Sequence, residues 1–281
     1  MKMVVIGAAG QLGQAVVAKF SGEHDVTPAT RREVDLSDHR GLRAFVMDRK
    51  PAVVINCAAY TNVDGAEDEQ ETALDVNAFA VRTLARATTD LGATLVHFST
   101  DFVFSGTATT PYTEDDGPEP QGVYAQSKLL GEWIAADNPR HYVLRVESLF
   151  GGPRARSSVD RIADAVRAGD QAPVFIDRVV SPSFADDVVG ATGHLLRNQS
   201  PPGLYHCVNS GSGTWLDVGR EIARLLDQPD TTLKPVSMRD LKLRAPRPYY
   251  AALSNAKLAA AGYAMPSWQD ALQRYLTRRS A

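Results

Sequence analysis

Tyr124 and Lys128, four residues apart in the run Tyr-Ala-Gln-Ser-Lys, are the side chains of this chain best suited to acid–base chemistry. Residues at positions i and i+4 lie one above the other on the same face of a helix. A free phenol, with a pKa near ~10, is a poor proton donor or acceptor at neutral pH, but a nearby ammonium group favours the phenolate. We therefore expect Lys128 to bring the pKa of Tyr124 toward the working range.

A third polar group is expected beside this pair. Ser99, Thr100 and Asp101 stand at the end of an apolar run, and the hydroxyl of Thr100 or Ser99 is placed to hydrogen-bond the same substrate oxygen. Together with Tyr124 and Lys128, these residues predict a carbonyl-reducing site. The Tyr–Lys spacing alone is weak evidence, because two solvated helix residues show the same pattern.

The N-terminus carries a glycine turn between a strand pattern and a helix pattern. Residues 3–6 form an apolar run, glycines follow at every third position, and helical periodicity covers 11–20. This order of elements is the one that a dinucleotide-binding turn requires, although the spacing is G-x-x-G-x-x-G and not G-x-G-x-x-G. The helix N-terminus then faces the pyrophosphate. The residues of this turn expected to bind a dinucleotide are Gly7, Gly10, Gln11, Leu12 and Gly13.

The second strand pattern, 25–29, lacks the acidic residue that would bind a ribose 2′-hydroxyl. Arg31 and Arg32 stand there instead. A guanidinium at that place suits a 2′-phosphate, so NADP(H) is the preferred cofactor and NAD(H) the alternative. Asp35 and Leu36 are expected beside the adenine. A solvated loop is the other interpretation of the two arginines.

Strand and helix patterns alternate through the first half, and the strands are continuous apolar runs. This predicts an α/β fold with a doubly wound parallel, Rossmann-type sheet. Residues 1–150 are expected to form an NADP(H)-binding domain, and 151–281 a smaller C-terminal substrate lobe interleaved with it. The expected strands are 3–6, 25–29, 52–57, 93–98 and 141–146, and the expected helices are 11–20, 38–49, 71–91, 122–138, 158–168, 184–197, 214–226 and 267–278.

Composition narrows the class of partners and the location. A net charge of −3 over 281 residues gives no case for nucleic acid, and the apolar runs are too short for a membrane span. Without a signal-peptide layout, and with Cys57 and Cys207 read as core thiols, a cytoplasmic location is expected. His97 and His206 are interpreted as core residues, and Trp133 as packing beside Leu129 and Leu130. No metal site is expected, because the acidic cluster at 67–71 is typical of a helix start.

With the glycine turn and the Tyr–Lys motif taken together, the chain resembles the dTDP-4-dehydrorhamnose reductase family of the extended short-chain dehydrogenase/reductases. The matching stretches occur in the same order over nearly the whole chain. They are Gly7–Gly13, Asn56–Asp64 with Ala66 and Glu67, Val76–Asn77, Ser99–Phe104, Tyr124–Lys128 with Gly131 and Glu132, Pro182–Asp187, and Arg247–Pro248.

The resemblance implies a catalytic trio of Thr100, Tyr124 and Lys128. It implies NADPH-dependent reduction of the 4-keto group of a nucleotide-linked 6-deoxy sugar, dTDP-4-dehydrorhamnose to dTDP-L-rhamnose or a close analogue. A homodimer is expected as the assembly. Further cofactor contacts are implied for Ala58, Ala59, Tyr60 and Asn77, and substrate contacts are expected for Val63, Thr100, Phe102, Glu147, Ser148, Arg178 and Arg247.

The departures from the family lie at the sugar end. Phe102 stands where the family usually has tyrosine, and Arg145-Val-Glu-Ser148 replaces Arg-(Thr/Ser)-(Ser/Ala)-Trp. Ser148 thus replaces the tryptophan that would flank the sugar in the family, and the residue before it, Glu147, carries a carboxylate. Glu147 either contacts the sugar or pairs with an arginine and faces away. Arg154 and Arg156 are further candidates, with Arg178 and Arg247, for clamping a diphosphate.

Three alternative functions remain open from the sequence. The same residues would serve a reductase of another nucleotide sugar or carbonyl, or an epimerase that retains its dinucleotide. A non-catalytic regulatory subunit of the methionine adenosyltransferase beta type is the third, although an intact Thr100, Tyr124 and Lys128 set disfavours it. Consumption of NADPH with a panel of nucleotide 4-keto sugars separates these classes.

Overall fold

A parallel six-stranded sheet forms the centre of the computed structural model, which describes residues 1–153 and 156–280. Its strand order confirms the predicted doubly wound fold, because β2 lies on one side of β1 and β3 on the other. The crevice of such a sheet opens outside the carboxyl ends of the strands at this reversal. Across the sheet the strands are β2 (Asp25–Ala29), β1 (Lys2–Ile6), β3 (Val53–Asn56), β4 (Thr94–Thr100), β5 (His141–Val146) and β8 (Gly203–His206).

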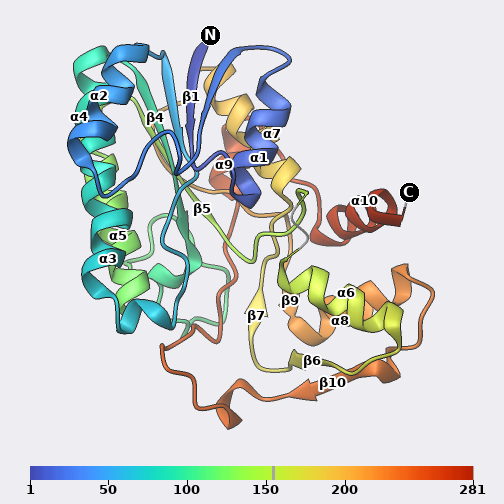
Figure 1. The fold of residues 1–281 in the computed structure, drawn as a ribbon. Helices are drawn as coiled ribbons and strands as arrows, with labels where there is room; N and C mark the ends of the chain where they lie inside the picture. Colours follow the sequence, from blue (N-terminus) through green and yellow to red (C-terminus); the bar gives the residue numbers. More distant parts are fainter. Residues whose placement is uncertain (154–155, 281) are drawn as a thin grey trace.

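Helices cover both faces of the sheet (Figure 1). α1 (Gln11–Phe20) packs with α7 (Ala185–Arg197) on one face, and α2 (His39–Arg49), α4 (Ala80–Leu91) and α5 (Val123–Ala135) pack together on the other. The strands are buried between them because their Val, Ile and Leu side chains point to both faces. In the part that the structure describes, no helix is long and apolar enough to cross a membrane.

The region expected as one helix over 71–91 is interrupted. α3 (Gln70–Leu74) and α4 are joined by η2 (Asp75–Phe79), a π-helical turn with Asn77 buried at its centre. A π turn inserts one residue into the helix and frequently occurs at functional sites. Hydrophobic periodicity continues across it, so the sequence pattern does not reveal the interruption.

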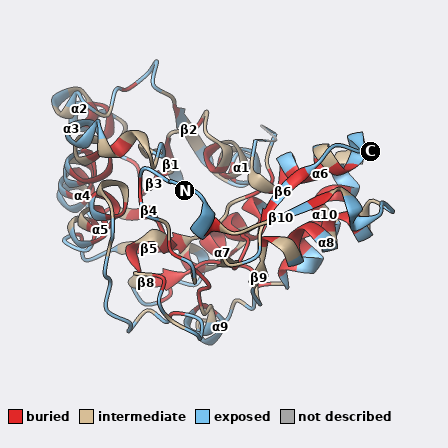
Figure 2. Cartoon of the chain, turned by 90° about the horizontal axis from the view of Figure 1, so that it is seen from below, coloured by how far each residue is buried: buried red, intermediate tan, exposed pale blue. Residues whose placement is uncertain are grey.

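A smaller group of elements follows β5 and has its own apolar core around Phe150, Phe184 and Trp215 (Figures 1 and 2). Its helices begin and end within two residues of the predicted bounds, whereas its strands are too short to show alternation in the sequence. The elements are α6 (Ser158–Ala168), β6 (Ala172–Phe175), β7 (Val179–Val180), β9 (Gly213–Thr214), α8 (Trp215–Leu225), β10 (Leu233–Val236) and α10 (Trp268–Ser280). The short helix α9 (Ala256–Ala260), which is not predicted from the sequence, packs against β8 of the large sheet instead. Short 3₁₀ turns are η1 (Gly65–Glu67), η3 (Asp101–Val103), η4 (Asp230–Thr232) and η5 (Met238–Asp240).

Trp133 does not pack in the core. His97 and His206 are fully buried, as expected, but Trp133 on α5 is 60% exposed. The reason is helical geometry, since Trp133 comes seven residues after Gln126, which is exposed on the same face. The buried face of α5 instead carries Leu129 and its neighbours, so the expected packing role of Trp133 is wrong.

Candidate active site

The turn after β1 is possible only with glycine. Gly7 has φ +75°, and a Cβ there would lie 2.7 Å from the backbone nitrogen of Ala58. A Cβ on Gly13 would lie 2.2 Å from the Gly7 carbonyl oxygen. Gly10 caps α1, whose first turn carries no acidic side chain. The N-terminus of α1 therefore faces the crevice with free N–H groups, an arrangement that suits the phosphates of a dinucleotide.

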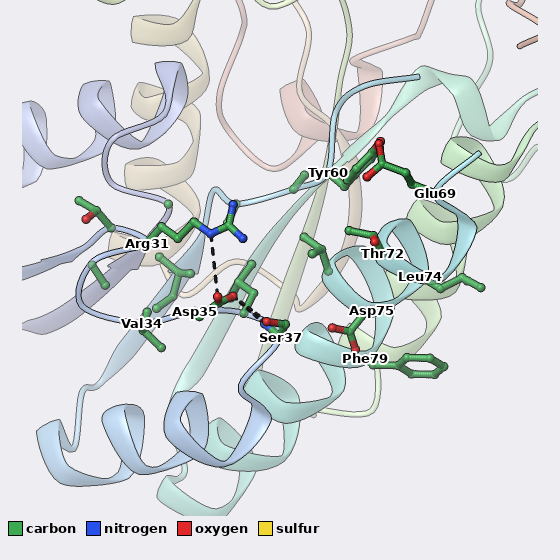
Figure 3. A pocket seen from close by; sticks show the side chains of 18 of the residues that line it. Arg31, Val34, Asp35, Ser37, Tyr60, Glu69, Thr72, Leu74, Asp75 and Phe79 are labelled. Atoms are coloured by element: carbon green, nitrogen blue, oxygen red, sulfur yellow. Dashed lines mark hydrogen bonds and ion pairs between the residues drawn. The ribbon is translucent and has the colours of Figure 1, made fainter. Parts of the chain in front are cut away.

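An outer cavity of about 920 Å³ opens beyond the ends of β1, β2 and β3 (Figure 3). Arg31 and Asp35 line one side of it and Tyr60 lines the other (Figure 3), and Leu36 is also among its lining residues. The Arg31 Nε atom lies 3.9 Å from Asp35 Oδ2, and hydrogen bonds from Ser37 lower the pKa of Asp35. The Arg31 side chain is 89% exposed, so it is free to move toward a bound anion.

An inner cavity of about 750 Å³ continues from the glycine turn into the molecule. Thr100 at the end of β4, and Tyr124 and Lys128 in the first turns of α5, line it as well. The three residues predicted to act together are thus brought into one cavity. Other predicted residues that line it are Gly7, Gly10, Gln11, Leu12, Arg31, Ala58, Ala59, Val63, Phe102 and Ser148.

Burial sets the protonation of the tyrosine and the lysine. It raises the pKa of Tyr124 to about 12, against a smaller lowering by a hydrogen bond with Thr100. Burial also lowers the pKa of Lys128 to about 8, and Lys128 Nζ donates a 2.6 Å hydrogen bond to the Phe98 carbonyl. The expected lowering of the phenol pKa is therefore wrong, because removal from water favours the neutral form of each group.

Asn77 supports the cavity from behind. Its Oδ1 accepts a hydrogen bond from the Tyr60 backbone nitrogen at 2.9 Å, and its Nδ2 donates to the Tyr60 carbonyl and to Ser127 Oγ. Asn77 thereby joins the loop after β3 to α5. It does not line the cavities, and neither do four other predicted residues, Gly13, Arg32, Glu147 and Arg247.

Arg247 forms an ion pair with Asp64. Its two terminal nitrogens donate to the carboxylate of Asp64 at 2.7 and 2.8 Å, and one of them also donates to the Ala245 carbonyl. Arg247 itself does not line these cavities, but its segment lies beside two residues predicted to bind substrate. A small hollow is lined by Ala245, Pro246 and Pro248 together with Val63, Phe102 and Tyr124. Arg156 lines the inner cavity, whereas Arg154 lies outside the described residues.

At the sugar end, Ser148 separates two cavities. It has φ +45° and lines both the inner cavity and a lobe cavity of about 380 Å³. Arg178 and Trp215 also line the lobe cavity. Glu147 is buried behind Ser148, where its Oε2 accepts a hydrogen bond from the Ser181 backbone nitrogen. Of the two residues that depart from the family here, only Ser148 faces a cavity.

Cys57 and Asp101 line the inner cavity, although neither of them is assigned a role there from the sequence. Cys57, expected as a core thiol, lines it at the end of β3, whereas Cys207 is buried. Asp101 lines it beside Thr100. Cys57 directly follows the last residue of β3, and Asp101 directly follows the last residue of β4. The sequence shows that both residues lie near strand ends, but it does not show the direction of their side chains. Among the described residues, no group of three or more His, Cys, Asp or Glu side chains is placed to hold a metal ion.

The position of the catalytic residues defines the class of protein. A hydroxyl, a phenol and an ammonium group line the same cavity as a dinucleotide-binding turn, on a doubly wound sheet. This is the arrangement of an oxidoreductase of the short-chain dehydrogenase/reductase class.

Comparison with known proteins narrows the class to a family. A family model described as the RmlD substrate binding domain matches residues 1–280. The chain is 35% identical to the dTDP-4-dehydrorhamnose reductase of Mycolicibacterium smegmatis, over 97% of this chain and 84% of that protein. It is 34% identical to a probable dTDP-4,6-dihydroxy-2-methyloxan-3-one 4-ketoreductase of Streptomyces antibioticus, over 97% of this chain and 94% of that protein.

A solved structure gives the same result. The dTDP-4-dehydrorhamnose reductase of Bacillus anthracis, in complex with NADP, superposes with a TM-score of 0.93 at 29% identity and covers 99% of this chain and 100% of that one. The chain belongs to the dTDP-4-dehydrorhamnose reductase family.

Proposed function

We propose that this protein uses NADPH to reduce the 4-keto group of a dTDP-linked 6-deoxy sugar, dTDP-4-dehydrorhamnose or a close analogue. The observation that carries the proposal is that Thr100, Tyr124 and Lys128 line one cavity together with the glycine turn after β1. The relatives named for this reaction, and the related structure in complex with NADP, support it. When bound, the cofactor supplies the hydride that adds to the carbonyl carbon.

The residues of this chain supply binding and the proton. Gly10 and the N-terminus of α1 would hold the pyrophosphate, and Lys128 the ribose next to the nicotinamide. Tyr124 is a neutral phenol at physiological pH, which is the form that can protonate the oxygen as negative charge develops on it. Thr100 orients the same oxygen by hydrogen bonding. The cavity thus favours a catalytic role over that of a regulatory subunit.

A second substrate is favoured by the changed sugar end. Ser148 and Phe102 offer less stacking area and one hydroxyl fewer than the usual family residues. The Streptomyces antibioticus relative is named for a differently hydroxylated dTDP-keto sugar. Steady-state NADPH oxidation with a panel of dTDP-4-keto sugars tests the proposal. If no sugar of the panel supports NADPH oxidation, the proposal is contradicted.

We also propose a division of labour within the chain. Residues 1–150 carry the outer cavity and most of the inner one, which supports an NADP(H)-binding role. Residues 151–281 supply most of the lobe cavity, including Arg161, Arg178 and Trp215. Two guanidinium groups beside an aromatic ring suit a nucleoside diphosphate, so we assign this lobe to the nucleotide part of the substrate.

Assembly and location belong to the same proposal. An exposed Trp133 ring on α5 supports a homodimer, which the mass of the protein in solution tests. Cys57 and Cys207 are both free, which supports a cytoplasmic location.

Arg31 is expected to read the cofactor's 2′-phosphate. Replacing it with alanine removes a charge-assisted hydrogen bond of roughly 1.5–3 kcal/mol, or about ten- to two-hundredfold in NADPH affinity. NADH affinity should barely change. Arg32→Ala is the matched control, because Arg32 does not line the outer cavity and should affect neither cofactor. Fluorescence titration of both dinucleotides measures this, and equal weakening of the two by Arg31→Ala would refute the assignment.

A further inference from the structure

Asp101 is placed directly against Thr100. It follows β4, is 3% exposed, and its Oδ1 accepts a 3.0 Å hydrogen bond from Thr100 Oγ1. Its Oδ2 lies 3.7 Å from an Arg178 nitrogen and accepts no hydrogen bond from the described residues. A hydroxyl has a single hydrogen to donate. The Thr100 hydroxyl can therefore donate either to Asp101 or to the substrate oxygen. The charge on Asp101 determines how strongly Asp101 competes for this hydrogen.

Glu147 occupies the equivalent position on the neighbouring strand. Thr100 and Val146 are register partners in β4 and β5, so Asp101 and Glu147 are the next residues along adjacent parallel strands. Adjacent strands lie about 4.8 Å apart. Glu147 is 1% exposed, and its Oε1, like Asp101 Oδ2, accepts no hydrogen bond of ordinary length and angle from the described residues; the Ser148 hydroxyl nearby only partly offsets the raised pKa of Glu147. Asp101 and Glu147 are therefore neighbouring buried carboxyl groups, and each has one oxygen that lacks a hydrogen-bond donor of ordinary geometry.

The surrounding charges do not neutralise two carboxylates. Arg178 lies beside Asp101 and is the cation of this group, while Lys128 donates to a backbone carbonyl. The other titratable side chains facing the pair in the described structure are Tyr124 on α5 and Tyr250 after β10, both neutral at physiological pH. With both acids ionised, one buried negative charge would remain uncompensated, which is costly.

Protonation of one carboxyl removes this cost. An O–H between the two groups supplies a donor for both unpartnered oxygens and leaves one carboxylate opposite Arg178. The electrostatics agree with this, since burial raises the pKa of Asp101 to about 6. Burial and the neighbouring Asp101 together raise the pKa of Glu147 well above its usual range.

We propose that Asp101 and Glu147 form a carboxyl pair that shares one proton and positions the Thr100 hydroxyl for the substrate carbonyl. The shared proton weakens the hold of Asp101 on the Thr100 hydrogen, so that Thr100 can donate to the substrate oxygen. Loss of the proton adds a second negative charge beside an oxygen that is itself becoming negative. Asp101 and Glu147 are positioning residues, and this role rests on the proposed function.

Infrared spectroscopy of the protein without substrate tests the shared proton. A band of a protonated carboxylic acid is expected at neutral pH, shifted in heavy water, and absent from both Asp101→Asn and Glu147→Gln. Asp187→Asn is the matched control, because Asp187 is a buried carboxylate whose oxygens accept hydrogen bonds from Arg274. Absence of the band from the wild type, or its persistence in both variants, would overturn the pair whatever the substrate is.

The pH dependence of stability is a second measurement without substrate. The folded state holds a proton that the unfolded chain releases above the ordinary Glu pKa. Stability is therefore full below that value and is lost as pH rises toward the folded-state pKa. Glu147→Gln lacks this loss, so its melting temperature should gain on that of the wild type between about pH 5 and about pH 8. A constant difference across that range would count against the shared proton.

Kinetics test the positioning role. The alkaline fall of kcat in the wild type should contain two ionisations, that of the pair and that of Lys128, and in Glu147→Gln only one. The KM for NADPH should not change. Superimposable pH profiles of wild type and variant would overturn the positioning role. An intact infrared band in a protein that reduces no keto sugar would instead count against the proposed function alone.

Discussion

Tyr124→Phe is expected to lower turnover by a factor on the order of 10² to 10⁴. The variant keeps the ring, which packs edge-on against Phe102 with centroids 5.5 Å apart, and removes only the transferable proton. Burial keeps the phenol protonated in the wild type, so the substitution removes the group that supplies the proton. Steady-state NADPH oxidation measures the effect, and NADPH titration should show cofactor affinity nearly unchanged.

Tyr249→Phe provides the comparison for this variant. Tyr249 is 38% exposed and lines none of the three cavities, so removal of its hydroxyl should leave turnover within experimental error. Turnover of Tyr124→Phe close to that of Tyr249→Phe would exclude Tyr124 as the proton donor. Loss of turnover together with loss of NADPH binding would instead indicate damage to the cavity.

The cofactor end of the site could be predicted because its signals are local. A strand, a glycine turn and a helix follow one another within 20 residues. Gly13 is required by a backbone contact inside that unit, and Gly7 by its positive φ and by its contact with Ala58, just after the adjacent strand β3. Arg31 likewise is the second residue after β2. Such features depend on chain neighbours and on one adjacent strand, which the sequence pattern already contains.

The sugar end could be predicted only in part, because it depends on contacts between distant segments. Arg247 pairs with Asp64, which is 183 residues away, and no local pattern in the sequence indicates this contact. Glu147 and Ser148 are neighbours in sequence, yet only Ser148 faces the cavities, since its φ of +45° turns the chain between them. A sequence contains no direct record of such a turn at a non-glycine residue.

The buried ion pair between Arg145 and Glu132 was not predicted either, although it attaches the catalytic helix to the sheet. Arg145 on β5 donates two hydrogen bonds, of 2.8 and 2.7 Å, to the carboxylate of Glu132 on α5, and both side chains are at most 5% exposed. The adjoining His206 stays neutral, since burial, with Arg145 beside it, lowers its pKa to about 3. Glu132 is therefore the partner that compensates the Arg145 charge.

Glu132→Leu is expected to lower the free energy of unfolding by about 3–5 kcal/mol, because it leaves the Arg145 charge buried without a carboxylate. Glu221→Leu is the matched control. Glu221 accepts the same two-pronged hydrogen bond from Arg224, at 2.7 and 2.9 Å, but the Arg224 side chain is 65% exposed, so its loss should cost about 0–1 kcal/mol.

The double variant Glu132→Leu with Arg145→Met separates burial of a lone charge from loss of packing. It removes both charges, so most of the stability lost in Glu132→Leu should return. Urea unfolding at neutral pH measures all three proteins. If Glu132→Leu were no more destabilising than Glu221→Leu, the attachment of α5 to the sheet would have to come from its apolar face alone. If the double variant were as unstable as Glu132→Leu, the contact of the Arg145 guanidinium with the Phe104 ring, 4.8 Å away, would be the larger contribution.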